Sequence, residues 1–249
     1  MIHSFLLIGQ SNMAGRGVIS EAIPVTTEHI KILRNGRWQK MFRPINPDRR
    51  FSGVSLAESF AEAYAQKYNV DVGLIPCADG GTHLEQWQEG SLLYDNAVYQ
   101  ARLASRTSTI VGVLWHQGES DCADELRNTY CVRFEKIMHA LRRDLQLHDV
   151  PFILGGLGDF LKDCTADPWV KNYQKVNEEL QNVAARNERT AFVSAEGLTG
   201  KEDNLHFDAK ALYAFGLRYF DAYERIKGNG KIQAENKESD TVLSAMEEL

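Results

Sequence analysis

Residues 2–15 read IHSFLLIGQSNMAG, and this stretch decides the fold class of the chain. Within it, residues 5–8 (FLLI) form a short and wholly apolar run, which is typical of a strand buried on both faces. The run ends at once in Gly9 and the polar residues 10–12 (QSN). We therefore expect a buried strand whose carboxyl end is followed by small and polar groups.

The same pattern of a short apolar run followed by an amphipathic stretch recurs along the chain. Buried strands that alternate with helices imply βαβ crossovers and a parallel sheet between two helical layers. The expected fold class is α/β, a three-layer α/β/α sandwich with a five-stranded, mainly parallel sheet. The expected strands are residues 4–8, 70–76, 110–115, 151–155 and 190–194. The expected helices lie within residues 56–64, 92–106, 134–145, 169–187 and 209–226.

The length of 249 residues fits one α/β domain. We expect this domain to span residues 1–226 and to contain one long connection, residues 16–52. A hairpin with a tight turn at Asn35-Gly36 is predicted inside that connection, and we expect it to cap the site. Residues 227–249 are polar and are predicted to form a tail.

Composition excludes several classes of partner. The chain has 28 Lys plus Arg against 34 Asp plus Glu, so its formal net charge of −6 provides no electrostatic footprint for nucleic acid or anionic membranes. No apolar run approaches the roughly 20 residues that cross a bilayer. The start of the chain lacks the features of a secretory signal, which predicts a cytoplasmic location. Nothing in the sequence decides the oligomeric state.

Polar residues follow each predicted strand, and ligands of open α/β sheets bind at that edge. Ser11 is a candidate nucleophile, because a turn after a buried strand exposes its hydroxyl beside backbone N–H groups. The alternative is that Ser11 only caps a helix. The α/β-hydrolase elbow G-x-S-x-G does not fit, because Met13 occupies the position of its second glycine.

Asp203 and His206 are spaced so that the carboxylate can orient the imidazole as a general base, although such a pair can also be surface decoration of a helix start. Gly80, Gly81 and Gln117 offer the backbone and amide N–H donors of an oxyanion hole. Their alternatives are a tight Gly-Gly turn and an amide that satisfies a loop carbonyl.

Four blocks in this order resemble the SGNH hydrolase superfamily, whose fold is flavodoxin-like. The similarity is greatest to its sialate O-acetylesterase and acetylxylan esterase branch, carbohydrate esterase family six. It covers about residues 2–225. The blocks are residues 9–15 (GQSNMAG), 80–82 (GGT), 115–121 (WHQGESD) and the pair Asp203 and His206.

This resemblance implies a role for each matching residue. Ser11 is the expected nucleophile and an oxyanion donor through its N–H, His206 the base and Asp203 its orienter. A glycine of Gly80-Gly81 is the expected second donor. The superfamily commonly has an asparagine as third donor; this chain has Gln117 in the corresponding block.

The implied activity is that of a serine esterase that removes O-acetyl groups from carbohydrates through an acetyl-enzyme, with no metal and no other cofactor. A small acetylated carbohydrate is the expected substrate, and the sequence does not say which sugar. Two alternatives stay open. The first is a lipase-like or thioesterase-like hydrolase of short acyl esters, and the second is a noncatalytic carbohydrate-binding relative.

Further residues near the strand ends are candidates for lining the site. For each tryptophan among them a place in the core is the favoured alternative, and Trp115 is expected to be core. His116 is as compatible with a satisfied loop residue as with a site residue, and Glu119 and Asp121 fit helix-capping acids. The candidates are Gln10, Asn12, Trp87, His116 and Glu119, followed by Arg16, Trp38, His83 and Trp169.

Overall fold

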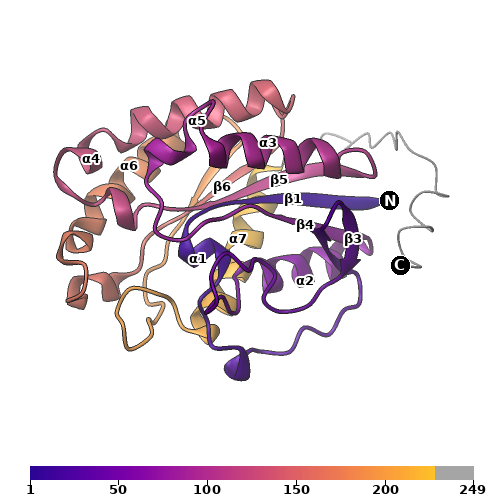
Figure 1. The fold of residues 1–249 in the computed structure, drawn as a ribbon, viewed down its shortest axis with the longest axis horizontal. Helices are drawn as coiled ribbons and strands as arrows, with labels where there is room; N and C mark the ends of the chain where they lie inside the picture. The colour runs from indigo at the N-terminus through magenta and orange to yellow at the C-terminus, as the bar shows by residue number, and fades with distance from the viewer. Residues whose placement is uncertain (228–249) are drawn as a thin grey trace.

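A seven-stranded sheet forms the middle layer of the molecule in the computed structural model (Figure 1). The strands stand in the order β3-β2-β4-β1-β5-β6-β7, and every neighbouring pair is parallel except β2 and β3. The structure describes residues 1–227, apart from the side chain of Asp124. The predicted tail, beyond Lys227, lies outside the described residues. The strands are β1 Ile2–Gly9, β2 Ile30–Arg34, β3 Arg37–Lys40, β4 Asp71–Pro76, β5 Ser108–His116, β6 Phe152–Gly155 and β7 Thr190–Val193.

The α/β class and the mainly parallel sheet are confirmed, but the prediction of five strands is wrong. The two additional strands are those of the predicted hairpin, which extends the sheet at its edge. Residues 30–32 of β2 pair in parallel with residues 72–74 of β4. The sequence pattern missed this pairing because β2 and β3 are short and lie inside a long polar connection. Ile30 and Ile32 are nevertheless fully buried, and their burial fixes the hairpin against the sheet.

The expectation that the hairpin caps the site is also wrong. Its Trp38 is only 2% exposed, and the indole Nε1–H donates to Thr107 Oγ1 at 3.0 Å. A Cβ at Gly73 on β4 would meet the Trp38 ring at 2.6 Å, so the ring packs directly on the sheet. Trp38 is therefore a core residue at the sheet edge, and none of residues 30–40 lines the pocket described below.

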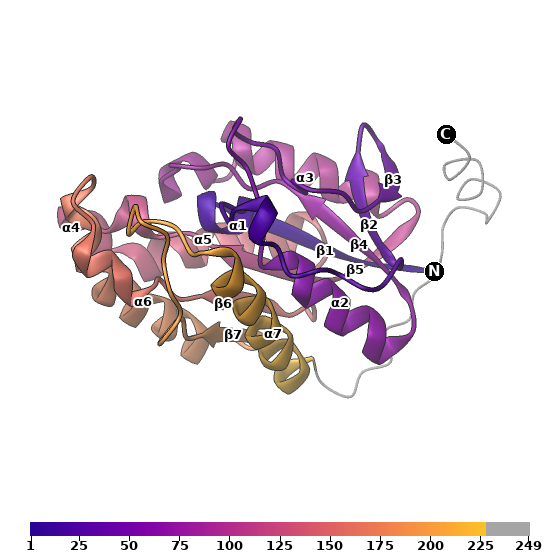
Figure 2. The same ribbon diagram turned by 90° about the horizontal axis from the view of Figure 1, so that it is seen from below.

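Helices cover both faces of the sheet. Figure 1 shows α3 and α5 above the strands and α2 and α7 below them, and Figure 2 shows the α2 and α7 face in front. Each face has its own core, because successive side chains of a strand point to opposite sides: Leu6 and Ile8 belong to one core, Phe5 and Leu7 to the other. The longer helices are α2 Ala57–Tyr68, α3 Leu92–Ala104, α5 Tyr130–Asp144, α6 Tyr173–Arg186 and α7 Ala209–Ile226. Among residues 1–227 no helix has the length and apolarity needed to span a membrane.

Short helical turns follow the strands at their carboxyl ends, where the chain leaves the sheet. Strand β1 lies between β4 and β5, so the connections on its two sides diverge there and leave a crevice. Gly9 ends β1 with a φ of +127°, and a Cβ on it would lie 2.1 Å from the His116 carbonyl oxygen of β5. Only glycine allows this close approach. The short turns are α1 Ser11–Ala14, η1 Ile19–Glu21, η2 Leu84–Trp87, η3 Glu119–Asp121, α4 Asp124–Asn128, η4 Asp159–Asp163 and η5 Pro168–Asn172.

Replacing Trp38 by alanine should lower the free energy of unfolding by about 3–5 kcal/mol, because it leaves a cavity under the hairpin. For a chain of this size that corresponds to a fall in Tm of roughly 6–20 °C, measured by thermal unfolding followed by circular dichroism. Trp169→Ala is the matched control, because Trp169 is 44% exposed and its loss should shift Tm by about 2 °C at most. Equal shifts in the two variants would contradict the core position of Trp38.

Candidate active site

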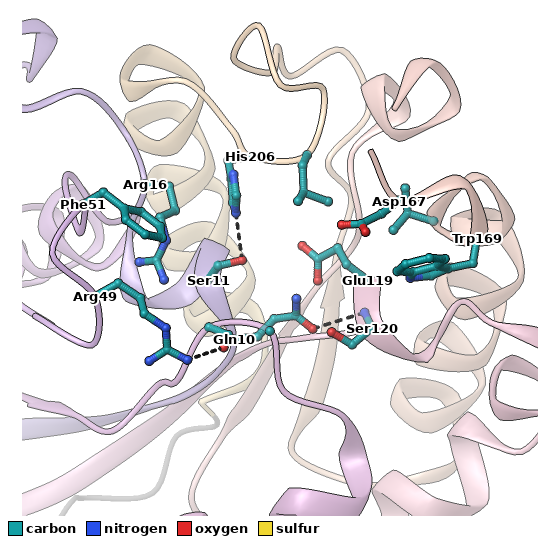
Figure 3. Close-up of a pocket in the computed structure, with 14 residues that line it drawn as sticks. Gln10, Ser11, Arg16, Arg49, Phe51, Glu119, Ser120, Asp167, Trp169 and His206 are labelled. Atoms are coloured by element: carbon teal, nitrogen blue, oxygen red, sulfur yellow. Dashed lines mark hydrogen bonds between the residues drawn. The ribbon is translucent and has the colours of Figure 1, made fainter. Parts of the chain in front are cut away.

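Ser11, His206 and Asp203 form a hydrogen-bonded chain at the carboxyl edge of the sheet, and Figure 3 shows its link between Ser11 and His206. Ser11 is the first residue of α1, directly after β1, and His206 and Asp203 lie in the loop that precedes α7. Ser11 Oγ lies 3.1 Å from His206 Nε2, and His206 Nδ1 lies 2.8 Å from Asp203 Oδ2. The fold thus brings Ser11 together with His206, which lies 195 positions later in the sequence.

The environment of Asp203 favours its ionised form. Partial burial would raise the pKa of this carboxyl, but hydrogen bonds from His206 and from backbone N–H groups outweigh it and hold the pKa well below its usual range. Its Oδ1 accepts from the N–H of Leu205 at 2.9 Å and from that of His206 at 3.0 Å. An ionised Asp203 accepts a hydrogen bond from the N–H at Nδ1 of His206. Nε2 then carries no proton and can accept a hydrogen bond from the Ser11 hydroxyl.

Asn12 fixes the backbone on both sides of His206. Its Oδ1 accepts from the N–H of Phe207 at 3.1 Å, and its Nδ2 donates to the carbonyl of Leu205 at 3.2 Å. The same Nδ2 donates to Glu119 Oε1 at 2.5 Å. Asn12 is 1% exposed and does not line the pocket, so it supports the site from below.

The two glycines of the second block have different environments. The N–H of Gly80 donates to Asp48 Oδ2 at 2.8 Å, so it is already occupied. Gly81 has a φ of +76° and open space where a side chain would lie. Within residues 1–227, its N–H has no hydrogen-bond acceptor. Both glycines line the same pocket as Ser11.

Asp48 anchors this glycine turn, and sequence reasoning missed it. Arg16 makes a bidentate ion pair with Asp48, Nη1 to Oδ1 at 3.0 Å and Nη2 to Oδ2 at 2.7 Å. Both side chains are almost fully buried. Burial alone would raise the pKa of Asp48, but hydrogen bonds from Arg16 and Ser52 outweigh it and lower the pKa. Asp48 belongs to no motif, because its partners lie 32 residues away in both directions.

Gln117 is occupied elsewhere. Its Nε2 donates to the carbonyl of Thr82 at 3.0 Å and to Asp121 Oδ2 at 2.6 Å, and its Oε1 accepts from the Tyr130 hydroxyl at 2.9 Å. The Thr82 carbonyl can only accept, so the orientation of this amide is fixed. Gln117 is fully buried and does not line the pocket, which differs from the predicted placement.

In contrast to Gln117, the side chain of Gln10 is held through its oxygen. Its Oε1 accepts from the N–H of Gly118 at 3.3 Å and from that of Ser120 at 3.5 Å. Backbone N–H groups can only donate, so the oxygen must lie on that side and Nε2 on the other. Figure 3 shows Nε2 on the side that faces the pocket near Ser11. No acceptor for it exists among residues 1–227.

The remaining predicted lining residues divide between the core and the pocket. Trp87 is 1% exposed and packs edge-on against Trp115, so it is a core residue. His116 is fully buried with Nε2 3.2 Å from the Gly156 carbonyl, and burial lowers its pKa. Neither these residues nor His83 line the pocket. Arg16, Glu119 and Trp169 do.

The pocket has a volume of about 280 Å³. Four of its residues belong to no motif, and sequence reasoning did not find them: Arg49, Phe51, Asp167 and Val170. Ser120 and Leu205 lie within recognised motifs but were not predicted to line the pocket. In the described part of the chain, no three His, Cys, Asp or Glu side chains are arranged to hold a metal ion.

Asp48→Asn should lower the free energy of unfolding at pH 7 by about 3–5 kcal/mol, because it leaves the Arg16 guanidinium buried without a counter-charge. In an Arg16→Met background the same substitution should cost much less. A double-mutant cycle by chemical denaturation measures this difference. Equal costs in both backgrounds would show that Asp48 and Arg16 do not stabilise each other.

The same cycle should depend on pH. The pKa of Asp48 is lower in the folded chain than in the unfolded chain, so the stabilisation from its ionised form is complete above about pH 4. It is lost as the pH falls through the folded pKa. The difference in unfolding free energy between wild type and Asp48→Asn should therefore shrink at pH 3, and an unchanged difference would contradict the assignment.

Comparison with known proteins matches almost the whole described chain to one family. The family described as carbohydrate esterase, sialic acid-specific acetylesterase, matches residues 1–225. The chain is 31% identical over 248 residues to the probable carbohydrate esterase At4g34215 of Arabidopsis thaliana, with 88% of this chain and 89% of the relative covered. The solved structure of that Arabidopsis protein superposes with a TM-score of 0.79 at 30% identity, over 90% of this chain and 98% of the other.

Two more distant structures share the fold. A carbohydrate acetylesterase from Xanthomonas citri is 17% identical with a TM-score of 0.69, over 91% of this chain and 56% of the other. NanS is 19% identical with a TM-score of 0.66, over 90% of this chain and 97% of the other. The resemblance drawn from the four sequence blocks is thereby confirmed. The chain belongs to the sialic acid-specific acetylesterase family of carbohydrate esterases, and it is an esterase.

Proposed function

We propose that this esterase removes O-acetyl groups from carbohydrates through an acetyl-enzyme intermediate. The observation that carries the proposal is the hydrogen-bonded chain from Ser11 through His206 to Asp203. Its Ser11 end lies in a pocket of about 280 Å³. A serine next to an oriented imidazole is the arrangement that nucleophilic acyl transfer needs.

In the first half-reaction, Ser11 Oγ attacks the acetyl carbonyl carbon while His206 Nε2 takes the hydroxyl proton. Asp203, ionised at neutral pH, stabilises the imidazolium that forms. The tetrahedral intermediate then collapses with cleavage of the bond between the acetyl carbon and the sugar oxygen. His206 returns its proton to that oxygen, and the sugar leaves as an alcohol.

In the second half-reaction, water attacks the acetyl-Ser11 carbonyl and His206 accepts a proton from the water. Collapse of the second intermediate releases acetate, and the proton on His206 returns to Ser11 Oγ. The two half-reactions consume one ester and one water and need no oxidant or reductant.

Three donors are free to stabilise the oxyanion. The Ser11 N–H lies at the start of α1 and, like that of Gly81, has no acceptor among residues 1–227. The third donor is Gln10 Nε2, in place of the Gln117 amide that the sequence pattern suggested. An oxyanion donor must be fixed before the reaction. The two hydrogen bonds to Gln10 Oε1 provide that fixation.

Ser11→Ala should reduce kcat for p-nitrophenyl acetate and for an acetylated xylo-oligosaccharide by about 10⁴-fold or more, because no other group can form the acyl-enzyme. Acetate release should be unaffected by a chelator. Activity that persists in Ser11→Ala would refute the nucleophile.

A fall in activity of more than tenfold from p-nitrophenyl acetate to p-nitrophenyl octanoate would support a small acyl pocket.

Gln10→Ala should reduce kcat for p-nitrophenyl acetate by about 100- to 1000-fold with little change in KM, as expected for a contact made in the transition state. Gln10→Glu is the matched variant, since it keeps the side-chain size and an oxygen acceptor but replaces the donor. It should be at least as slow. A loss under tenfold in both variants, together with a large loss in a folded Gln117→Ala, would reassign the donor to Gln117.

A further inference from the structure

The pocket has two chemically different walls on either side of Ser11 (Figure 3). One wall carries Arg16 and Arg49 with the exposed ring of Phe51. The other carries Glu119, Asp167 and the half-exposed indole of Trp169. The charge that each wall presents to a substrate depends on which of these groups already has a partner.

The arginine wall is neutralised by the protein. Arg16 pairs with Asp48 at 2.7 Å and is only 3% exposed. Arg49 pairs with Asp79 at 2.6 Å, and its second terminal nitrogen donates to the Gly80 carbonyl at 2.8 Å. Each guanidinium therefore has a carboxylate within contact distance. This wall offers no uncompensated positive charge to an anionic ligand.

The opposite wall has carboxylates without cations. Glu119 is 2% exposed, its Oε1 accepts from Asn12, and its Oε2 has no hydrogen-bond partner. Among residues 1–227, the one basic group within 4 Å of it is His116, with Nδ1 3.9 Å from Oε1, and burial lowers the pKa of that imidazole so that it is neutral at pH 7. In the described part of the chain, the Asp167 carboxylate has no hydrogen-bond or ion-pair partner, while the backbone carbonyl of Asp167 accepts from the Val170 N–H at 3.1 Å.

We propose that this wall selects a neutral sugar ester, with Asp167 as a specificity-determining residue and Trp169 as the surface on which the sugar ring stacks. The inference rests on the proposed esterase function and assigns the class of its substrate. Carboxylates accept hydrogen bonds from the free hydroxyls of a sugar, and an indole face packs against its C–H groups. An anionic sugar would bring a like charge next to Asp167 and Glu119, which is strongly unfavourable in a partly desolvated site.

The test compares kcat/KM for acetate release from two esters, a mono-O-acetylated methyl xyloside and an O-acetylated N-acetylneuraminic acid, which is anionic. The wild type should favour the neutral ester by at least about tenfold. Asp167→Asn should reduce this preference by about three- to tenfold, because it removes one repelling charge and keeps the shape of the side chain. Raising the ionic strength should reduce the preference in the wild type more than in the variant.

Asp163→Asn is the matched control. Asp163 is an exposed residue of η4 outside the pocket, so its substitution removes the same unit of charge from the same region of the chain. The preference for the neutral ester should be the same as in wild type. An equal effect of the Asp163 and Asp167 substitutions would overturn the proposal, because it would show a response to net charge alone.

Trp169→Ala should raise KM for the neutral sugar ester by about tenfold, and Trp169→Phe should restore most of the affinity because a ring remains. An unchanged KM in the alanine variant would remove the stacking surface. Equal or faster turnover of the anionic ester by the wild type would overturn the charge selection. If that turnover were lost in Arg49→Gln, the arginine wall would be the one that binds the sugar.

Hydrolysis of p-nitrophenyl acetate, with its loss in Ser11→Ala, separates this inference from the proposed function. An enzyme that releases acetate from both sugars through Ser11 but shows no preference for the neutral one refutes the inference alone. An enzyme that hydrolyses p-nitrophenyl acetate through Ser11 but releases acetate from neither sugar refutes the inference and the carbohydrate substrate of the proposed function, and leaves the Ser11 esterase mechanism standing. An enzyme without Ser11-dependent hydrolysis of any ester refutes both.

Discussion

The close approach of β1 and β5 at Gly9 is the constraint on which the site depends. The N–H of Gln10 donates to the His116 carbonyl at 2.8 Å, and the missing side chain at Gly9 makes this contact possible. The contact places the residues after β1 directly beside those after β5. Gln10 then accepts from Gly118 and Ser120, and Asn12 donates to Glu119. Two segments more than a hundred residues apart are thereby joined into one rigid floor under Ser11.

Several buried charged groups around this floor are paired with other polar groups, and each set of partners fixes one part of the site. Asp48 and Arg16 support the glycine turn. Asp121 accepts from Gln117 and from the N–H of Leu84 and pairs with Arg133 at 2.8 Å, which fixes the segment after the glycines. Breaking such a pair leaves a buried charge without its partner, so substitution of either residue should be strongly destabilising. The site is preorganised because its supports lie in a low-dielectric interior where hydrogen bonds are strong.

The sequence could predict the parts of the molecule that depend on local pattern. Buried apolar runs predicted the five parallel strands, and four short motifs predicted that Ser11, Asp203 and His206 would meet. It could not show that the hairpin joins the sheet, because β2 and β3 are short and their burial depends on β4. Nor could it distinguish Gln10 from Gln117, because both carry an amide. Which N–H is free depends on partners such as Ser120, Thr82 and Tyr130, which the spacing does not reveal. Asp48, Phe51 and Asp167 were missed because they belong to no sequence motif.

The two walls of the pocket differ in how freely they can diverge during evolution or design. Arg49 and Phe51 belong to the same connection as Asp48, so a new loop on that side must also supply a partner for Arg16 and for the Gly80 N–H. Asp167 and Trp169 lie in the segment around η5. They have no hydrogen bond to Ser11, His206 or Asp203, nor to Gln10 or Gly81. On the proposed function, exchange of that segment should change which sugar is recognised and leave the hydrogen bonds among Ser11, His206 and Asp203 in place. Substrate range in relatives with this layout is therefore expected to vary on the Asp167 side of Ser11 only.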